Sequence, residues 1–230
     1  NYYLNVFQTG STQTAAAVQF NIAFGDSNGS GSVLYDSGIN GKSYTSTVFG
    51  QWQNIVLGDE NNNFVYGGVT PVTQSFYAIA VERANYKGSI FPGTLDLRIT
   101  GSGAPGSEIR LTDNSNDVST IVYNEAGRVF QIVSGSAGSA NAYSPTSAVA
   151  NGMTVSGSYG LFLPDIGAIL LNASALDLPV VNGGVVLGTE YASNTADDNN
   201  AKLFNAISSS RTFTLNSQEN ITSDYVFVRA

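Results

Sequence analysis

One stretch of the sequence has the spacing of a serine nucleophile elbow, G-x-S-x-G, at Gly25-Asp26-Ser27-Asn28-Gly29. A serine hydroxyl becomes an effective nucleophile only beside a general base, and histidine has this role most often. The chain contains no histidine, so a Ser-His-Asp triad is excluded. The stretch follows a strand-like segment and is rich in glycine and polar residues, which predicts a turn.

The same stretch has oxygen-bearing side chains at alternating positions, like the first half of a calcium-binding loop, with Gly31 in the sixth position. The twelfth position, where such loops have a bidentate glutamate, is Ser37. Asp113-Asn114-Ser115-Asn116-Asp117 has a similar spacing, but Val118 stands where the loop needs glycine. Both stretches are therefore predicted to be polar turns, and no metal-binding residue is assigned.

Paired carboxylates catalyse glycoside hydrolysis when the fold places them about 5–10 Å apart across a cleft. The candidates are Asp59-Glu60, Asp165, Asp177 and Asp197-Asp198. Sequence neighbours on a strand face opposite ways, and acidic residues beside Asn runs are typical of solvated turns. The chain also has no cysteine, and so no thiolate nucleophile or thiolate metal site. We expect no enzyme activity, no catalytic residue and no cofactor.

Aromatic side chains are the remaining candidates for a binding site. Most are expected in the core or at a subunit interface, where tyrosine and tryptophan provide large, rigid contact areas. A sugar- or peptide-binding groove is the alternative, although no spacing in the sequence specifies a platform. The aromatic residues concerned are Tyr2, Tyr3, Trp52, Tyr66, Phe76, Tyr77, Tyr159, Phe162 and Tyr225.

The elements that must position these residues are mostly strands. From Val18 to Phe24 every second residue is apolar, while Gln19, Asn21 and Ala23 fall on the opposite face. Similar patterns occur at residues 75–81, 94–99, 109–111, 120–123, 129–133, 167–171 and 224–228. Helices are predicted only at residues 197–208 and 50–57, with a further turn at 172–176. The predicted fold class is mainly β, with antiparallel sandwich-like sheets and one or two short helices; α+β is the alternative.

Runs of Gly, Ser and Asn separate these segments, at residues 25–31, 61–63, 101–106 and 134–139. Residues 134–157 carry no charge and are the best candidate for a long loop or an interdomain joint. One β-rich domain over residues 1–230 is predicted, as a segment of a longer protein. The alternative is a β domain at residues 1–140 followed by a second subdomain at residues 141–230.

The charge balance and the short apolar stretches argue against two kinds of partner. Lys and Arg number 9 against 17 Asp and Glu, a formal net charge of −8. Nucleic-acid binding draws on clustered Lys and Arg, so neither DNA nor RNA is expected. The longest apolar stretch, residues 166–171, is far shorter than the roughly 20 residues that span a bilayer, so no membrane insertion is expected.

Several segments resemble structural proteins of T4-like tailed phages, especially those that infect marine cyanobacteria. No single segment is specific, but their order and spacing are. The resemblance implies a virion component of the tail or baseplate, within a polypeptide that continues beyond the last residue; it implies no fold, ligand or catalytic residue. The segments are VERANYK (residues 81–87), FPGTL (91–95), RLTDNS (110–115), GRVFQIVSGS (127–136), YGLFLPDIG (159–167), KLFNAI (202–207) and FVRA (227–230).

The few arginines are expected to fix how elements or subunits fit together. Arg83, Arg110, Arg128 and Arg229 lie in or beside predicted strands. We predict that some of them form bidentate pairs with carboxylates; ordinary exposed charge is the alternative.

The sequence therefore predicts a non-catalytic structural component of a phage virion that forms homo-oligomers and contacts other virion proteins through β-rich interfaces. A receptor- or glycan-binding module at the particle or cell surface is the first alternative. It requires a solvent-open groove with Tyr or Trp beside Asp and Asn. A pilus or S-layer subunit of a cell surface is the third possibility.

Overall fold

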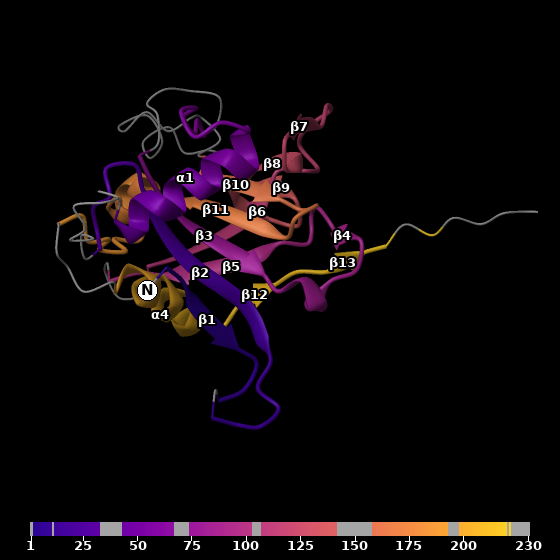
Figure 1. The fold of residues 1–230 in the computed structure, drawn as a ribbon. Coiled ribbons are helices and arrows are strands. Elements are labelled where there is room, and N and C mark those ends of the chain that lie inside the picture. Colours follow the sequence, from indigo (N-terminus) through magenta and orange to yellow (C-terminus); the bar gives the residue numbers. More distant parts are fainter. Residues whose placement is uncertain are drawn as a thin grey trace, which may run out of the picture.

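A computed structural model describes residues 2–10, 12–32, 43–66, 74–102, 107–141, 158–192, 198–219 and 221. Within these residues, eleven strands form one antiparallel sheet that curls into a half-barrel, and two more form a small second sheet (Figure 1). Three short helices accompany the sheets. The predicted mainly β, antiparallel fold with few helices is confirmed.

The large sheet has the strand order β1-β2-β3-β11-β10-β8-β6-β5-β12, and β7 and β9 also pair with β8. Its centre joins β3 to β11, two strands that are far apart in the sequence. The strands are β1 Leu4–Phe7, β2 Val18–Asp26, β3 Ser75–Val81, β4 Ser89–Ile90, β5 Asp96–Thr100, β6 Glu108–Asp113, β7 Val122–Asn124, β8 Gly127–Ser136, β9 Ser139–Ala140, β10 Gly160–Leu163, β11 Ala168–Asn172, β12 Phe213–Thr214 and β13 Ser217–Gln218.

Side chains that alternate along the central strands build two hydrophobic cores, one on each face of the sheet. Tyr77 and Ile79 of β3 belong to the core on the inner face, with Ile169 and Leu171 of β11. Phe76 and Ala78 point the other way, into a smaller core on the outer face. Because both faces are covered, β3, β10 and β11 are apolar at nearly every position.

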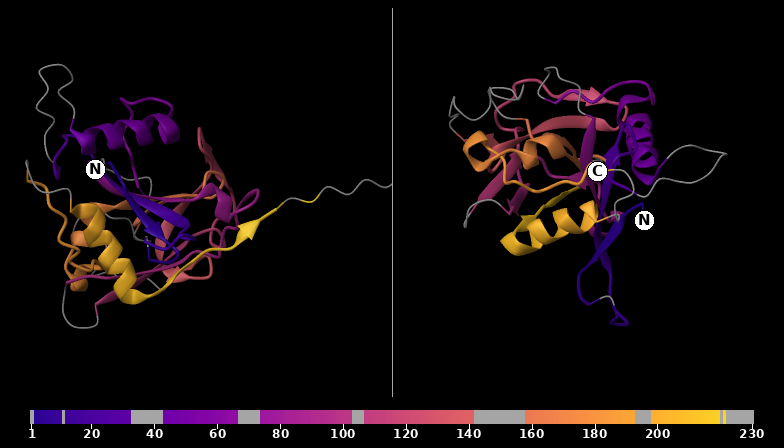
Figure 2. Two further views of the ribbon diagram at one scale, coloured as in Figure 1. Left: turned by 60° about the horizontal axis from the view of Figure 1, so that its bottom comes forward. Right: turned by 90° about the vertical axis from the view of Figure 1, so that its left-hand side faces the viewer.

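The helices cover these two faces from opposite sides (Figure 2). α4 (Asn199–Ser210) and α3 (Ala173–Asp177) pack into the inner core through Leu203, Ile207 and Leu176. α1 (Tyr44–Leu57) packs on the outer core through Phe49 and Val56. None of the helices in the described residues is long and apolar enough to cross a membrane.

α1 begins earlier than the helix predicted at residues 50–57. Ser43 is its N-cap, and the hydroxyl of Ser43 accepts a hydrogen bond from the Ser46 amide at 3.3 Å. The first turns of α1 were not predicted because they contain the β-branched residues Thr45, Thr47 and Val48, and such residues favour strands. The helix predicted at residues 197–208 is α4, and the turn predicted at 172–176 is α3.

Residues 134–139 were predicted to separate strands, and the turn that does so is confined to residues 137–138. β8 continues to Ser136, and a tight turn leads into β9. Ala137 and Gly138 both have positive φ angles, 52° and 76°, as a two-residue hairpin turn requires. The strand predicted at residues 224–228 and the loop residues 142–157 lie outside the described residues.

The curl of the sheet brings its two ends towards each other. The ring of Phe20 on β2 contacts the ring of Phe213 on β12 edge to face, with 5.0 Å between centroids, although β1 and β12 stand at opposite ends of the strand order. The segment that contains β12 and β13 runs along the open side of the half-barrel (Figure 1).

A substitution of Gly160, at the start of β10, tests whether the central strands must lie as close together as the structure has them. Its φ is 153°, and a Cβ atom there would lie 1.8 Å from the carbonyl oxygen of Leu170 on β11. We expect Gly160→Ala to lower the free energy of unfolding by about 3 kcal/mol or more, because backbone must move. Gly50 of α1 has no atom within 4 Å of such a Cβ, so Gly50→Ala should raise stability by about 0.5–1 kcal/mol.

Chemical denaturation followed by circular dichroism measures both variants. Equal effects of the two substitutions would contradict the close packing of β10 against β11.

Candidate functional site

The serine-elbow stretch forms a turn held by its own aspartate. The Oδ1 atom of Asp26 accepts hydrogen bonds from the amides of Asn28 at 2.9 Å and Ser30 at 3.0 Å. Burial raises the pKa of Asp26, and these amide bonds partly offset that effect. Ser27 is exposed in the turn. The predicted turn is confirmed, and its aspartate serves the backbone.

The second loop considered for calcium is built in the same way. Asp113 is fully buried. Its two carboxylate oxygens accept from the amide of Gly93 at 3.0 and 2.8 Å, and Oδ1 also accepts from the Ser115 amide at 3.0 Å. The carboxylate thus joins β6 to the turn before β5. Among the described residues, no group of three or more acidic side chains is placed to hold a metal ion.

Three of the carboxylates considered for glycoside hydrolysis have local partners on different elements. Asp59 accepts from Asn61 just after α1. Asp177 accepts from the hydroxyls of Thr189 and Tyr191. Asp198, at the start of α4, lies 3.8 Å from the ammonium group of Lys202. Asp197 lies outside the described residues.

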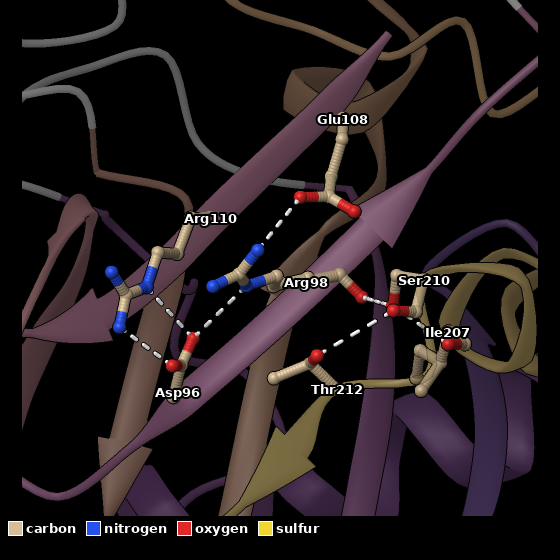
Figure 3. A network of polar contacts seen from close by, with 7 residues as sticks. All are labelled: Asp96, Arg98, Glu108, Arg110, Ile207, Ser210 and Thr212. Carbon is tan, nitrogen blue, oxygen red and sulfur yellow. Dashed lines mark hydrogen bonds and ion pairs between the residues drawn. The ribbon is translucent and has the colours of Figure 1, made fainter. Parts of the chain in front are cut away.

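Arg110 and Arg128 form the predicted bidentate pairs. Arg110 of β6 donates from Nε to Oδ1 of Asp96 at 2.9 Å and from its terminal nitrogen to Oδ2 at 2.6 Å, across the pair β5–β6 (Figure 3). Arg98 lies between Asp96 and Glu108 on the same face, with a hydrogen bond of 3.3 Å to Glu108 (Figure 3). This network occupies the outer face where β5 and β6 extend beyond the apolar cover.

Arg128 pairs with the fourth carboxylate considered for hydrolysis, Asp165. The guanidinium donates to Oδ1 of Asp165 at 2.6 and 3.0 Å and to Ser89 at 2.9 Å, and the Arg128 amide donates to Oδ2 at 2.8 Å. Arg83 has a different partner: it lies 4.6 Å from the centroid of the Tyr86 ring and donates to the Tyr86 carbonyl. Arg229 lies outside the described residues.

A solvent-open groove of about 450 Å³ lies on the outer face, between α1 and the strands β1, β2 and β3. We call it the aromatic groove. Three aromatic residues, four polar residues and five small or aliphatic residues line it. They are Tyr2, Tyr3 and Trp52; Asn5, Asn21, Gln51 and Glu82; and Val18, Ala23, Val48, Ala78 and Ala80.

The aromatic groove brings together three of the aromatic residues singled out in the sequence. Tyr66, Phe76, Tyr77, Tyr159 and Phe162 are buried, as expected for core residues, and Tyr225 lies outside the described residues. The sequence did not single out the polar members of the groove. Asn21 could have been found from the sequence, because the alternation along β2 places it on the face opposite to the core.

A second groove, of about 740 Å³, lies where the ends of the curled sheet approach each other. We call it the seam groove. It is mostly apolar, and Arg211 carries its only charge among the lining residues. These are Val6, Gln19, Phe20, Val81, Asn85, Tyr86, Ile90, Phe204, Ile207, Ser208 and residues 211–217.

The two arginine pairs predict how stability depends on pH. Hydrogen bonds from Arg110 hold the pKa of Asp96 below its usual value. Burial alone would raise the pKa of Asp165, but the hydrogen bonds from Arg128 outweigh it, so that pKa is also lowered. A carboxyl group with a lowered folded pKa stabilises the fold above its unfolded pKa, and this contribution is lost as pH falls through the folded pKa.

Replacing both arginines (Arg110→Ala with Arg128→Ala) should therefore destabilise the protein at about pH 7 and have little effect near pH 2. For Arg128 we expect a cost of about 1.5–3 kcal/mol at neutral pH, the range for hydrogen bonds to charged groups. Thermal melting of the wild type and the double variant across this pH range provides the test. A gap in melting temperature that stays constant as pH falls would contradict it.

No protein-family model, curated protein or solved structure matches the chain. The two grooves and the arginine pairs are therefore the structural features from which a function can be argued.

Proposed function

We propose that this chain is a non-catalytic structural component of a phage particle, in the tail or baseplate, and that it assembles with a second copy of itself along the seam groove. The seam groove carries this proposal, because it is a large, mostly apolar groove beside a strand edge that has no partner among the described residues. The resemblance to structural proteins of T4-like phages supports the same conclusion.

The apolar lining of the seam groove favours an apolar partner segment. Val6, Phe20, Val81 and Phe213 are only partly buried, yet they pack against the inner core and border the groove. Covering such side chains contributes about 25 cal/mol per Å² of apolar surface removed from water. Because Arg211 is the only charged lining residue, charge complementarity with a highly charged partner would contribute little.

The edge strand β1 favours a second copy of this chain as the partner at the seam groove. It is the first strand of the sheet, and among the residues that the structure describes it pairs on one side only, with β2. Its residues Leu4–Phe7 include no charge and no proline, the two features that usually prevent an edge strand from pairing. An antiparallel edge can pair with its own copy across a twofold axis, the commonest symmetry of protein oligomers. The same strand contributes Val6 to the seam groove.

A charge placed in the seam groove should prevent this assembly. Val6→Lys puts an ammonium group where Val6 faces the groove, and burying it unpaired is costly. We expect association to weaken at least tenfold, while the circular dichroism spectrum stays that of the folded chain. Light scattering over a range of concentrations measures the mass of the assembly.

Gln8→Lys is the matched control, because Gln8 is an exposed residue next to β1 and does not line the seam groove. It should assemble like the wild type. A wild-type chain that stays monomeric at every concentration, or a folded Val6→Lys variant that assembles normally, would refute the proposal.

A further inference from the structure

The floor of the aromatic groove is flat because its strands carry small side chains there. Ala23 of β2 stands opposite Ala78 of β3, and Asn21 stands opposite Ala80. Larger side chains would fill this space, as Phe76 does further along β3 under α1. The alanines thus leave an open strip of methyl groups beside the helix.

Two asparagine side chains lie in the strip, and one of them has an unpartnered oxygen in the described part of the chain. Asn5 and Asn21 are opposite each other on β1 and β2, so their amide side chains share the outer face. The Oδ1 atom of Asn21 is buried and has no hydrogen-bond partner among the described residues. An unsatisfied buried acceptor costs about 1–3 kcal/mol. The Oδ1 atom is shielded from solvent as it stands, so a bound molecule that donates a hydrogen bond would recover this energy by drawing the Asn21 amide towards the groove.

Aromatic rings stand on both sides of the strip. Tyr2 packs edge to face on Tyr44 of α1, with centroids 4.6 Å apart, which fixes one wall of the groove. Tyr3 is 58% exposed, and Trp52 of α1 is partly buried against the outer core. The face of an aromatic ring carries partial negative charge and attracts the positively polarised C–H groups of a neighbouring molecule.

These features exclude several classes of ligand. A peptide cannot add to the floor as a strand, because the backbone of β2 is already paired on both sides, with β1 and with β3. An anion finds Glu82 and no cationic side chain among the lining residues, in a chain of net charge −8. A purely apolar ligand would leave the amides of Asn5, Asn21 and Gln51 without partners.

We infer that the aromatic groove binds a neutral oligosaccharide. Such a molecule has hydroxyl groups that donate to the Asn21 oxygen and accept from amide N–H groups, and C–H faces that pack on Tyr3 and Trp52. The site is distinct from the seam groove, since Asn5 and Asn21 face outward whereas Val6 and Phe20 face the inner core. Its test is therefore independent of whether the chain assembles.

The single tryptophan of the chain makes the test direct. Trp52 is the only tryptophan, so tryptophan fluorescence reports on the aromatic groove alone. The probes are neutral tetrasaccharides of glucose, galactose, mannose and N-acetylglucosamine, titrated to millimolar concentration, with sulfated and sialylated oligosaccharides for comparison. We expect a saturable change in emission with at least one neutral probe and a weaker change, or none, with the anionic ones.

Two substitutions separate binding from folding. Asn21→Ala removes the unpartnered amide, so it should weaken binding at least tenfold while the melting temperature stays equal or rises. Tyr3→Ala removes an exposed ring and should also weaken binding at least tenfold. Tyr123→Ala is the matched control, because Tyr123 is a 67% exposed tyrosine on β7 that does not line the groove; its affinity should equal that of the wild type.

The inference is overturned if no neutral probe gives a saturable change, if anionic probes bind more tightly, or if Tyr3→Ala binds as well as Tyr123→Ala. A loss of binding in Asn21→Ala that comes with a lower melting temperature, together with normal binding in Tyr3→Ala, would also overturn it, since the asparagine would then serve the fold.

Discussion

The burial of both faces of β3, β10 and β11 is the constraint on which the rest of the structure depends. A strand that is apolar on both faces needs a cover on each, and this chain provides α3 and α4 on one side and α1 on the other. Each cover extends over only part of the sheet. Where α1 ends, the outer face must become polar or be covered by another molecule.

The outer face meets this requirement in two different ways. Over β5 and β6 it carries alternating charges, and hydrogen bonds and ion pairs connect Arg110, Arg98, Asp96 and Glu108 (Figure 3). Over β1 and β2 it carries alanines, uncharged amides and tyrosines. The first solution pairs these charges within the chain, although the Nε atom of Arg98 is buried without a hydrogen-bond partner among the described residues. The second leaves a buried acceptor on Asn21 unpaired beside aromatic rings, so the two ends of one sheet face differ in what they offer to a ligand.

Local features of the structure could be predicted from the sequence. Alternation identified β2, β3 and β8, the polar run at residues 25–31 identified the turn held by Asp26, and the positions of Arg110 and Arg128 in strands indicated carboxylate pairs. The turn at residues 134–139 was predicted too long, and the strand ends within it were missed, because glycine and serine occur at a strand end as readily as in a loop. The grooves were missed for a different reason. They arise from the pairing of strands and from the position of α1, and periodicity within one segment carries no information about either.

The β1–β2 hairpin links the two grooves through its register. On β1, Val6 faces the seam groove and its neighbour Asn5 faces the aromatic groove; on β2, Phe20 and Asn21 divide in the same way. Shifting β1 by one residue against β2 would exchange the faces: Asn5 would enter the apolar seam and Val6 would replace an amide in the aromatic groove. The pairing is irregular between Val6 and Phe7, the position where such a shift would begin. The same backbone hydrogen bonds that hold Leu4 opposite Ile22 therefore maintain both surfaces, and a change that loosens this hairpin would alter both of them together.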